Sequence, residues 1–175
     1  MGVQSTGDDL RTRRRRCLAI HTRPLSSPGK SGGRVGRIDY TIDAGRSLLH
    51  AVAVGDLDDD ALAAYVISYH AHPDYSPSLD EIVDFTGVAS VLVTGAGIRG
   101  LAHLVSHYGQ ASEGSRVALI ATTPVVYGLA RMYQALRADA PDDIRVVSDL
   151  VEAETWLGAA RTSDCVSSAR EPATG

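Results

Sequence analysis

The order of hydrophobic and polar positions divides the chain into alternating strand-like and helix-like segments. Residues 37–43 alternate with a period of two, and residues 48–55 are largely apolar, so the short turn between them predicts an antiparallel hairpin. Three further strands are predicted at 79–85, 116–121 and 144–147. The segment 116–121 is apolar almost throughout, as expected of a strand buried on both faces in a parallel sheet.

Four segments have the periodicity of helices. The first three are expected at about 59–71, from Gly95 to Tyr108 and from Pro124 onward, and the last covers 150–160. The acidic residues 58–60 would cap the first helix, and Thr94 would cap the second. The order ββαβαβαβα predicts an α/β fold with a mainly parallel central sheet of about five strands, an N-terminal hairpin and about four helices.

Composition separates the ends of the chain from its centre. Residues 1–36 contain an arginine run and many Ser, Gly and Pro, which predicts a disordered basic tail, and residues 161–175 predict a frayed one. The α/β domain is therefore expected at 37–160. The basic tail is either an arm for nucleic acid or an acidic partner, or an inert or non-native extension.

Charge restricts the partners of the central domain. Residues 1–37 carry nine Lys or Arg against two Asp, whereas the remainder carries eight Arg against nineteen Asp or Glu. The domain should therefore repel nucleic acid and anionic membranes, so nucleic acid is an unlikely partner except through the tail. No apolar run is long enough to cross a membrane, and Cys17 and Cys165 form no motif. A cytoplasmic location is the expectation.

A glycine motif, Gly95-x-Gly97-x-x-Gly100, follows an apolar run at the start of the second helix. In Rossmann proteins such glycines let the backbone approach a pyrophosphate at a helix N-terminus. The next strand should then end in an acid for the ribose, but residues 122–123 are both Thr. The single lysine, Lys30, also excludes the Tyr-x-x-x-Lys pair of short-chain dehydrogenases. Nucleotide binding through these glycines stays an alternative.

A longer pattern begins eleven residues before the first of these glycines. Asp84-Phe85-Thr86-Gly87-Val88 is followed, six residues later, by Thr94-Gly95. This spacing resembles the STAS domain, in which a strand ending in Asp-Leu-Ser-Gly-Val leads to Asp-Ser-Ser-Gly and a helix. Small bacterial SpoIIAA-like proteins of this family are also similar at Arg37–Tyr40, His72–Tyr75 and Gly128–Met132. The resemblance covers roughly residues 37–158.

The resemblance implies a non-catalytic regulatory module that binds a protein partner or holds a small apolar ligand between helices and sheet. Its candidate surface is the expected irregular loop 87–97 with the adjoining helices, and the candidate residues are Asp84, Thr86, Gly87, Thr94, Gly95 and Gly97. Thr94 falls on the serine that is phosphorylated in anti-sigma-factor antagonists. The acid that precedes that serine is replaced here by Leu92 and Val93, so Thr94 is either a switch or only a helix cap.

Catalytic and metal-binding patterns give no further assignment. There is no Gly-x-Ser-x-Gly, and no nucleophile has a base at a defined spacing. His103 and His107 lie four apart on one helix, but no third ligand has a defined spacing to them. We therefore expect neither catalytic residues nor a metal or other cofactor, and the sequence leaves the oligomeric state open.

Overall fold

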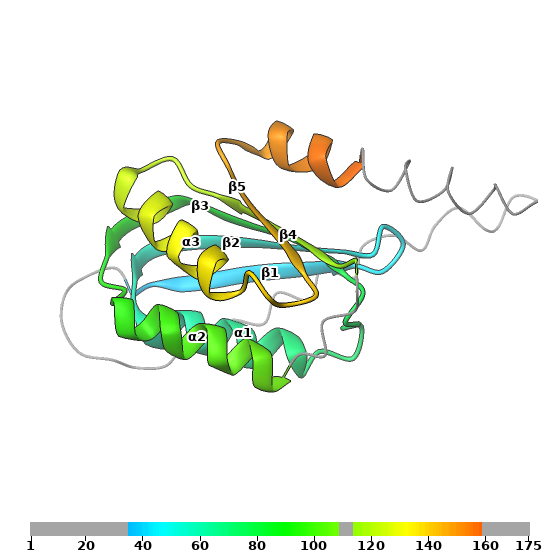
Figure 1. Cartoon of the computed structure of the whole chain (residues 1–175), viewed down its shortest axis with the longest axis horizontal. Helices are drawn as coiled ribbons and strands as arrows, with labels where there is room; N and C mark the ends of the chain where they lie inside the picture. The colour runs from blue at the N-terminus through cyan, green and yellow to red at the C-terminus, as the bar shows by residue number, and fades with distance from the viewer. Residues whose placement is uncertain (1–34, 109–113, 159–175) are drawn as a thin grey trace, which may run out of the picture.

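The computed structural model describes residues 35–108 and 114–158 of the chain. Its strands form one sheet in the spatial order β1-β2-β3-β4-β5, with β1 antiparallel to β2 and the other pairs parallel (Figure 1). The strands are β1 (Arg37–Asp43), β2 (Leu48–Leu57), β3 (Asp80–Val91), β4 (Arg116–Ile120) and β5 (Asp143–Val147). The predicted hairpin and the mainly parallel sheet are confirmed.

Helices cover both faces of this sheet. The helices are α1 (Asp59–His70), α2 (Gly95–Tyr108), α3 (Pro124–Leu136) and a C-terminal helix of residues 150–158. The first three lie on one face and the C-terminal helix lies on the other (Figure 1). Neighbouring residues of a strand point to opposite faces, so Leu48 and Ile82 pack with the C-terminal helix. Leu49 and Val83, the next residues along, pack with α1 and α3.

Each of the first three helices begins at a side chain that accepts a backbone N–H. Asp58 caps α1, Thr94 caps α2 and Thr123 caps α3. Pro124 occupies the first turn of α3, where its missing N–H breaks no helical hydrogen bond. The predicted capping by Thr94 and by one of the residues 58–60 is therefore confirmed.

One predicted boundary is wrong. The strand expected to end at Phe85 continues to Val91, so the irregular loop expected at 87–97 is reduced to residues 92–94. β3 pairs with β4 as far as Asp84 and, among the described residues, then continues beside β2 alone. Thr86 and Gly87, which indicated a loop, are instead part of a distorted strand.

The distortion in β3 is a β-bulge. Val52 and Val54 of β2 pair with Asp84 and Gly87, so β3 uses one residue more than β2 over this stretch. The Asp84 carboxylate accepts the backbone N–H of Thr86 at 2.8 Å, which satisfies a donor at the bulge. A second register shift follows closer to the end of β3.

A buried ion pair joins the starts of β3 and β4. The Arg116 guanidinium donates to both carboxylate oxygens of Asp80, with Nη2 to Oδ2 at 2.7 Å, and the Arg116 backbone N–H donates to Oδ1. Both side chains are almost fully buried. Two hydrogen bonds in a fork geometry help to offset the cost of removing these charges from water.

The predicted tails lie outside the described residues, except for Val35 and Gly36. The arginine run and both cysteines therefore fall outside the part of the chain that the structure describes.

Candidate functional site

The candidate site is a cavity between α2 and the sheet. α2 packs mainly against α1 and α3 rather than against a strand. Near its start, Ile98 packs with Ala53 and Leu57 of β2, but farther along the helix a space remains above the sheet. This cavity has a volume of about 120 Å³. Protein cores rarely contain voids larger than a water molecule, so a cavity of this size needs an explanation.

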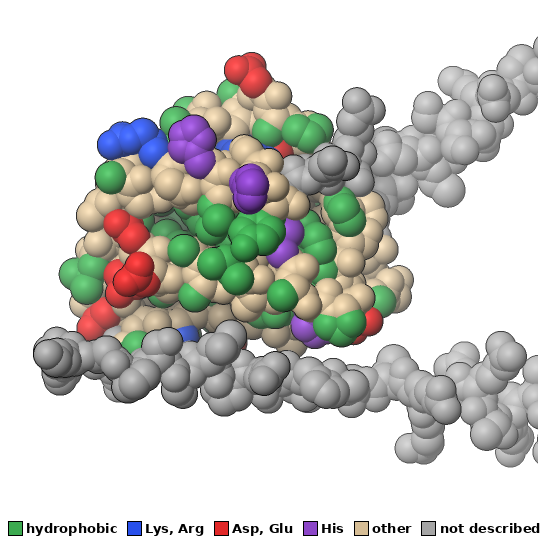
Figure 2. Space-filling view, turned by 90° about the horizontal axis from the view of Figure 1, so that it is seen from below, with side chains coloured by type: hydrophobic (Ala, Val, Ile, Leu, Met, Phe, Trp, Pro, Cys, Tyr) green, Lys and Arg blue, Asp and Glu red, His purple; other side chains and the backbone are tan. Residues whose placement is uncertain are grey.

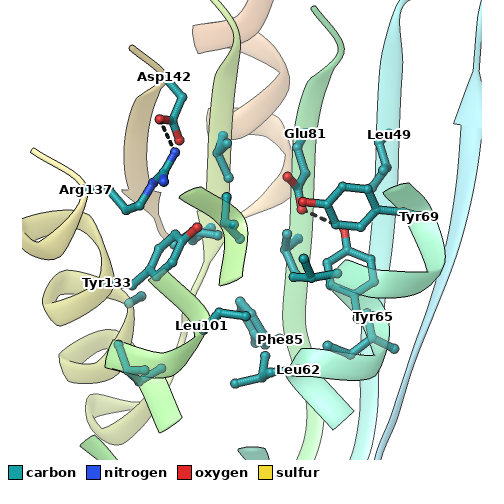
Figure 3. Close-up of a pocket in the computed structure, with 18 of the residues that line it drawn as sticks. Leu49, Leu62, Tyr65, Tyr69, Glu81, Phe85, Leu101, Tyr133, Arg137 and Asp142 are labelled. Atoms are coloured by element: carbon teal, nitrogen blue, oxygen red, sulfur yellow. Dashed lines mark hydrogen bonds and ion pairs between the residues drawn. The ribbon is translucent and has the colours of Figure 1, made fainter. Parts of the chain in front are cut away.

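The two ends of the cavity differ in polarity (Figure 3). Leu62 of α1, Phe85 of β3 and Leu101 of α2 lie at one end. Glu81 of β3 and Tyr133 of α3 lie toward the other. Glu81, Val83 and Phe85 alternate along β3, so the same strand supplies both the polar and the apolar lining. The arrangement suits a ligand with an apolar body and one polar group.

Glu81 is the titratable group at the centre of the polar end. Its Oε1 accepts a hydrogen bond from the Tyr65 hydroxyl at 2.6 Å. Burial raises the pKa of Glu81 from its ordinary value of 4.5 to about 7, the Tyr65 hydrogen bond lowers it and the charge of Asp142 raises it further. Glu81 therefore changes its charge near neutral pH.

Arg137 is a cation at the polar end of the cavity, and it forms an ion pair with Asp142. Arg137, just beyond the end of α3, donates from Nη2 to Asp142 at 2.6 Å and from Nη1 to Ser106 of α2 at 2.8 Å. The side chains of Arg137 and Asp142 are both almost fully buried, and the Arg137 Nε–H has no hydrogen-bond partner among the described residues. Their charges offset each other, so the polar end carries the negative charge of Glu81 when that group is ionised.

Tyrosines surround this carboxyl. Tyr65 and Tyr69 of α1 have ring centroids 4.9 Å apart, and the Tyr69 and Tyr75 rings are 5.4 Å apart. The Tyr75 hydroxyl is bonded to His70 Nε2 at 3.2 Å. The hydroxyls of Tyr69 and Tyr133 have no hydrogen-bond partner among the described residues. Burial and the charge of Glu81 raise the pKa of Tyr133, so its hydroxyl stays protonated.

Thr94, the main residue predicted from the sequence, lies elsewhere, at the start of α2. Its backbone N–H and its hydroxyl both donate to the Asp59 carboxylate, at 2.9 and 2.8 Å, and its oxygen accepts from Gly97 N–H at 2.9 Å. Gly97 lies so close to Asp59 that a Cβ at position 97 would overlap that carboxylate. A negative charge therefore occupies the helix end where a phosphate would bind, which argues against the nucleotide alternative.

The other predicted residues fall into two groups. Gly95 begins α2 near Met132 of α3, beside Thr94 and Gly97. Asp84, Thr86 and Gly87 form the β3 bulge, and Gly87 lies against the backbone of β2. The structure thus separates a helix-start group from a bulge group, and neither contains a residue of the polar end of the cavity.

The helix face opposite the sheet is also distinctive. Figure 2 shows hydrophobic side chains gathered at the centre of the face that α1 and α2 form, with histidine side chains around them. His103 and His107 are both exposed.

Among the described residues, no group of three or more His, Cys, Asp or Glu could hold a metal ion. No helix in the described part of the chain is long and apolar enough to cross a membrane.

Sequence reasoning missed the polar end of the cavity. The sequence feature that could have identified it is Glu81, an acidic residue at a position of a largely apolar strand that should face the helices. The pairing of Arg137 with Asp142 gave no local signal, because it depends on how the chain turns after α3.

Comparison with known proteins supports the fold. The sequence matches no protein-family model and no curated protein. A solved structure from Shewanella loihica PV-4, an uncharacterized protein of the DUF3478 family with a SpoIIAA-like fold, superposes with a TM-score of 0.50 at 18% identity. The match covers 74% of this chain and 99% of the other. The chain has a SpoIIAA-like fold, and the STAS-like resemblance inferred from its sequence is confirmed at that level.

Proposed function

We propose that this domain is a non-catalytic binding module that holds a small, mainly apolar ligand in the cavity between α2 and the sheet. The observation that carries the proposal is the cavity itself, about 120 Å³ in volume and lined mainly by apolar side chains from three helices and the sheet. Engineered apolar cavities of about 150 Å³ stay dry and bind benzene. A ligand whose hydrocarbon body is about the size of benzene therefore suits the cavity between α2 and the sheet.

The position of α2 supports the same proposal. A helix that packs on its two neighbours more than on the sheet leaves its inner apolar side chains, including Leu101 and Val105, incompletely packed. Filling the space would restore the dispersion contacts that those side chains lack. Binding should therefore stabilise the folded domain.

Thermal unfolding with toluene tests this proposal. Each kcal/mol of binding free energy should raise the unfolding midpoint by about 3 °C. Val105→Phe places a ring in the cavity and should abolish the response, whereas His103→Phe adds the same ring to the exposed side of α2 and should preserve it. If toluene gives no shift, or shifts both variants equally, the proposal is wrong.

A second candidate function is a partner-binding surface at the bulge of β3 and the start of α2, the region of Asp84, Thr86, Gly87, Thr94, Gly95 and Gly97. What supports it is an exposed apolar residue, Leu92, in the three-residue connection between the two groups. In the described part of the chain, the second half of β3 also does not pair with β4, which pairs with its first half.

A photo-crosslinking residue in cells tests this second candidate. Position 92 should give a discrete crosslinked product, and position 125 is the matched control, because Leu92 and Val125 are both apolar and both 60% exposed. Equal products at both positions, or none at position 92, would exclude a dedicated surface there.

The nucleic-acid alternative rests on the basic tail. Deleting residues 1–34 should then abolish binding to DNA or RNA, and unchanged binding would exclude this alternative.

A further inference from the structure

We infer that the cavity is specific for a small apolar amine, whose ammonium group binds at the Glu81 end while its hydrocarbon body lies toward Leu101 and Phe85. The inference deepens the proposed function and rests on it. It depends on three observations about the polar end of the cavity: its acceptors, its charge and its aromatic rings.

The polar end offers acceptors suited to an ammonium group. Tyr65 uses one oxygen of Glu81, and the other oxygen has no partner among the described residues. The unpartnered hydroxyls of Tyr69 and Tyr133 belong to the same end (Figure 3). An ammonium has three N–H donors and no acceptor, so the Glu81 oxygen and the two phenol oxygens match its hydrogen-bonding capacity.

The charge of the site excludes a carboxylate ligand. Arg137 lines this end; Asp142 and Ser106 engage its two Nη atoms, and its buried Nε–H has no partner among the described residues. Among the described residues, a carboxylate entering this end would meet the charges of Glu81 and Asp142 against the single positive charge of Arg137, which is unfavourable in a site removed from water. An ammonium instead forms a charge-assisted hydrogen bond with Glu81.

The rings add a second attraction for a cation. Tyr65, Tyr69 and Tyr75 all line the cavity, and the ring centroids of Tyr65 and Tyr75 lie 4.9 and 5.4 Å from that of Tyr69. Tyrosine faces attract ammonium groups through their quadrupoles, and the attraction grows when the pair is removed from water. An alcohol of the same shape would lack this contribution.

The charge state of Glu81 gives the inference a pH dependence. Glu81 has a pKa of about 7 in the empty site, so it is mostly neutral at about pH 6 and mostly ionised at about pH 8. The ammonium of an alkylamine stays charged throughout this range. The titratable and charged groups that face Glu81 from the surrounding elements are Tyr65, Tyr69, Tyr75, Tyr133, Arg137 and Asp142. The affinity for an amine should rise about tenfold between these two pH values, following the ionised fraction of Glu81.

Calorimetric titration of the full chain with phenethylamine, phenethyl alcohol and phenylacetate tests the inference. The three probes share a phenyl body and differ in the head group. At about pH 8 we expect the amine to bind at least about tenfold more tightly than the alcohol and phenylacetate not to bind.

Two variants separate the role of Glu81 from a general charge effect. Glu81→Gln keeps an acceptor for Tyr65 and removes the charge, so the preference for the amine and its pH dependence should disappear while the alcohol still binds. Asp139→Asn removes an exposed carboxylate of the α3–β5 connection and should leave the preference intact. Circular dichroism checks that both variants are folded.

The outcomes distinguish the two proposals. If toluene stabilises the protein but the amine is not preferred, or if Glu81→Gln binds the amine as the wild type does, the amine inference is wrong and the binding module stands. If neither toluene nor any phenethyl probe binds, both proposals fail.

Discussion

The Asp59 carboxylate joins the start of α1 to the start of α2 by accepting two hydrogen bonds from Thr94, from the backbone N–H at 2.9 Å and from the hydroxyl at 2.8 Å. The same hydroxyl accepts from the Gly97 N–H. This one contact bears on two sequence-based hypotheses. A negative charge already lies at the end of α2 where a nucleotide phosphate would bind, and a phosphate on Thr94 would be placed against that charge.

The glycines of the Gly-x-Gly-x-x-Gly motif should therefore differ in their effect on stability. Gly97→Ala would force Asp59 away from Thr94, because the new Cβ overlaps the carboxylate, and should cost about 1–2 kcal/mol of unfolding free energy. Gly100→Ala is the matched control, since no other described part of the chain comes within 4 Å of its Cβ position, and it should gain up to about 1 kcal/mol from helix propensity. Urea denaturation measures both changes. Equal effects would contradict a packing role for Gly97.

Thr94→Glu should destabilise the domain rather than reproduce an activated state. The new carboxylate would face the Asp59 carboxylate, and the hydrogen bond from the Thr94 hydroxyl to Asp59 would be lost. Together these changes should lower the free energy of unfolding by about 1–3 kcal/mol. Thr94→Ser retains the hydroxyl and should be within about 0.5 kcal/mol of the wild type. Thermal unfolding of the two variants checks the prediction. A glutamate variant as stable as the serine variant would instead favour a tolerated phosphorylation site.

Glu81→Gln should make the folded domain more stable at alkaline pH. The pKa of Glu81 is raised by burial from 4.5 to about 7, so between these values the folded state holds a proton that the unfolded state has lost. Stability therefore falls as pH rises through this window, by up to about 3 kcal/mol in total. The variant lacks this loss and should exceed the wild type at about pH 8, with the difference absent near pH 4. A constant difference across the range would contradict the raised pKa.

The buried and exposed ion pairs should differ sharply in their contribution to stability. Asp80→Asn leaves Arg116 buried without its countercharge and should cost about 3–5 kcal/mol. Asp39→Asn removes the negative charge of a similarly short but exposed ion pair with Arg37, at 2.8 Å, and should cost less than about 1 kcal/mol. Denaturant unfolding of both variants gives the comparison. Similar costs would mean that the environment of Asp80 is as well solvated as the surface.

Most of the fold was predictable because its signals are local. The bounds of β1 and α2 agree with those predicted from periodicity, and Thr94 caps α2 as its position indicated. The end of β3 was not predictable, because Thr86 and Gly87 carry the local signature of a turn. Their strand conformation depends on pairing with β2, far away in the sequence, and on a bulge that Asp84 completes.

The cavity was less predictable than the fold. A ligand between helices and sheet was one of the two functions that the family resemblance implied, but the residues that give the cavity its polar end were not identified. Glu81, Tyr133 and Arg137 come from separate elements and converge through packing, which a one-dimensional pattern does not record. Thr94 and the glycines belong to recognisable motifs. In the structure, Thr94 donates to the Asp59 carboxylate, and Gly97 leaves room for that carboxylate.

The most direct test of the central claim is the location of a bound apolar probe. With toluene added to methyl-labelled protein, intermolecular nuclear Overhauser effects should reach the methyl groups of Leu101 and Val105, which line the cavity. They should be absent at Val125 and Val151, which are exposed elsewhere. Effects at the exposed methyl groups alone, or at no methyl group, would contradict a ligand site beneath α2.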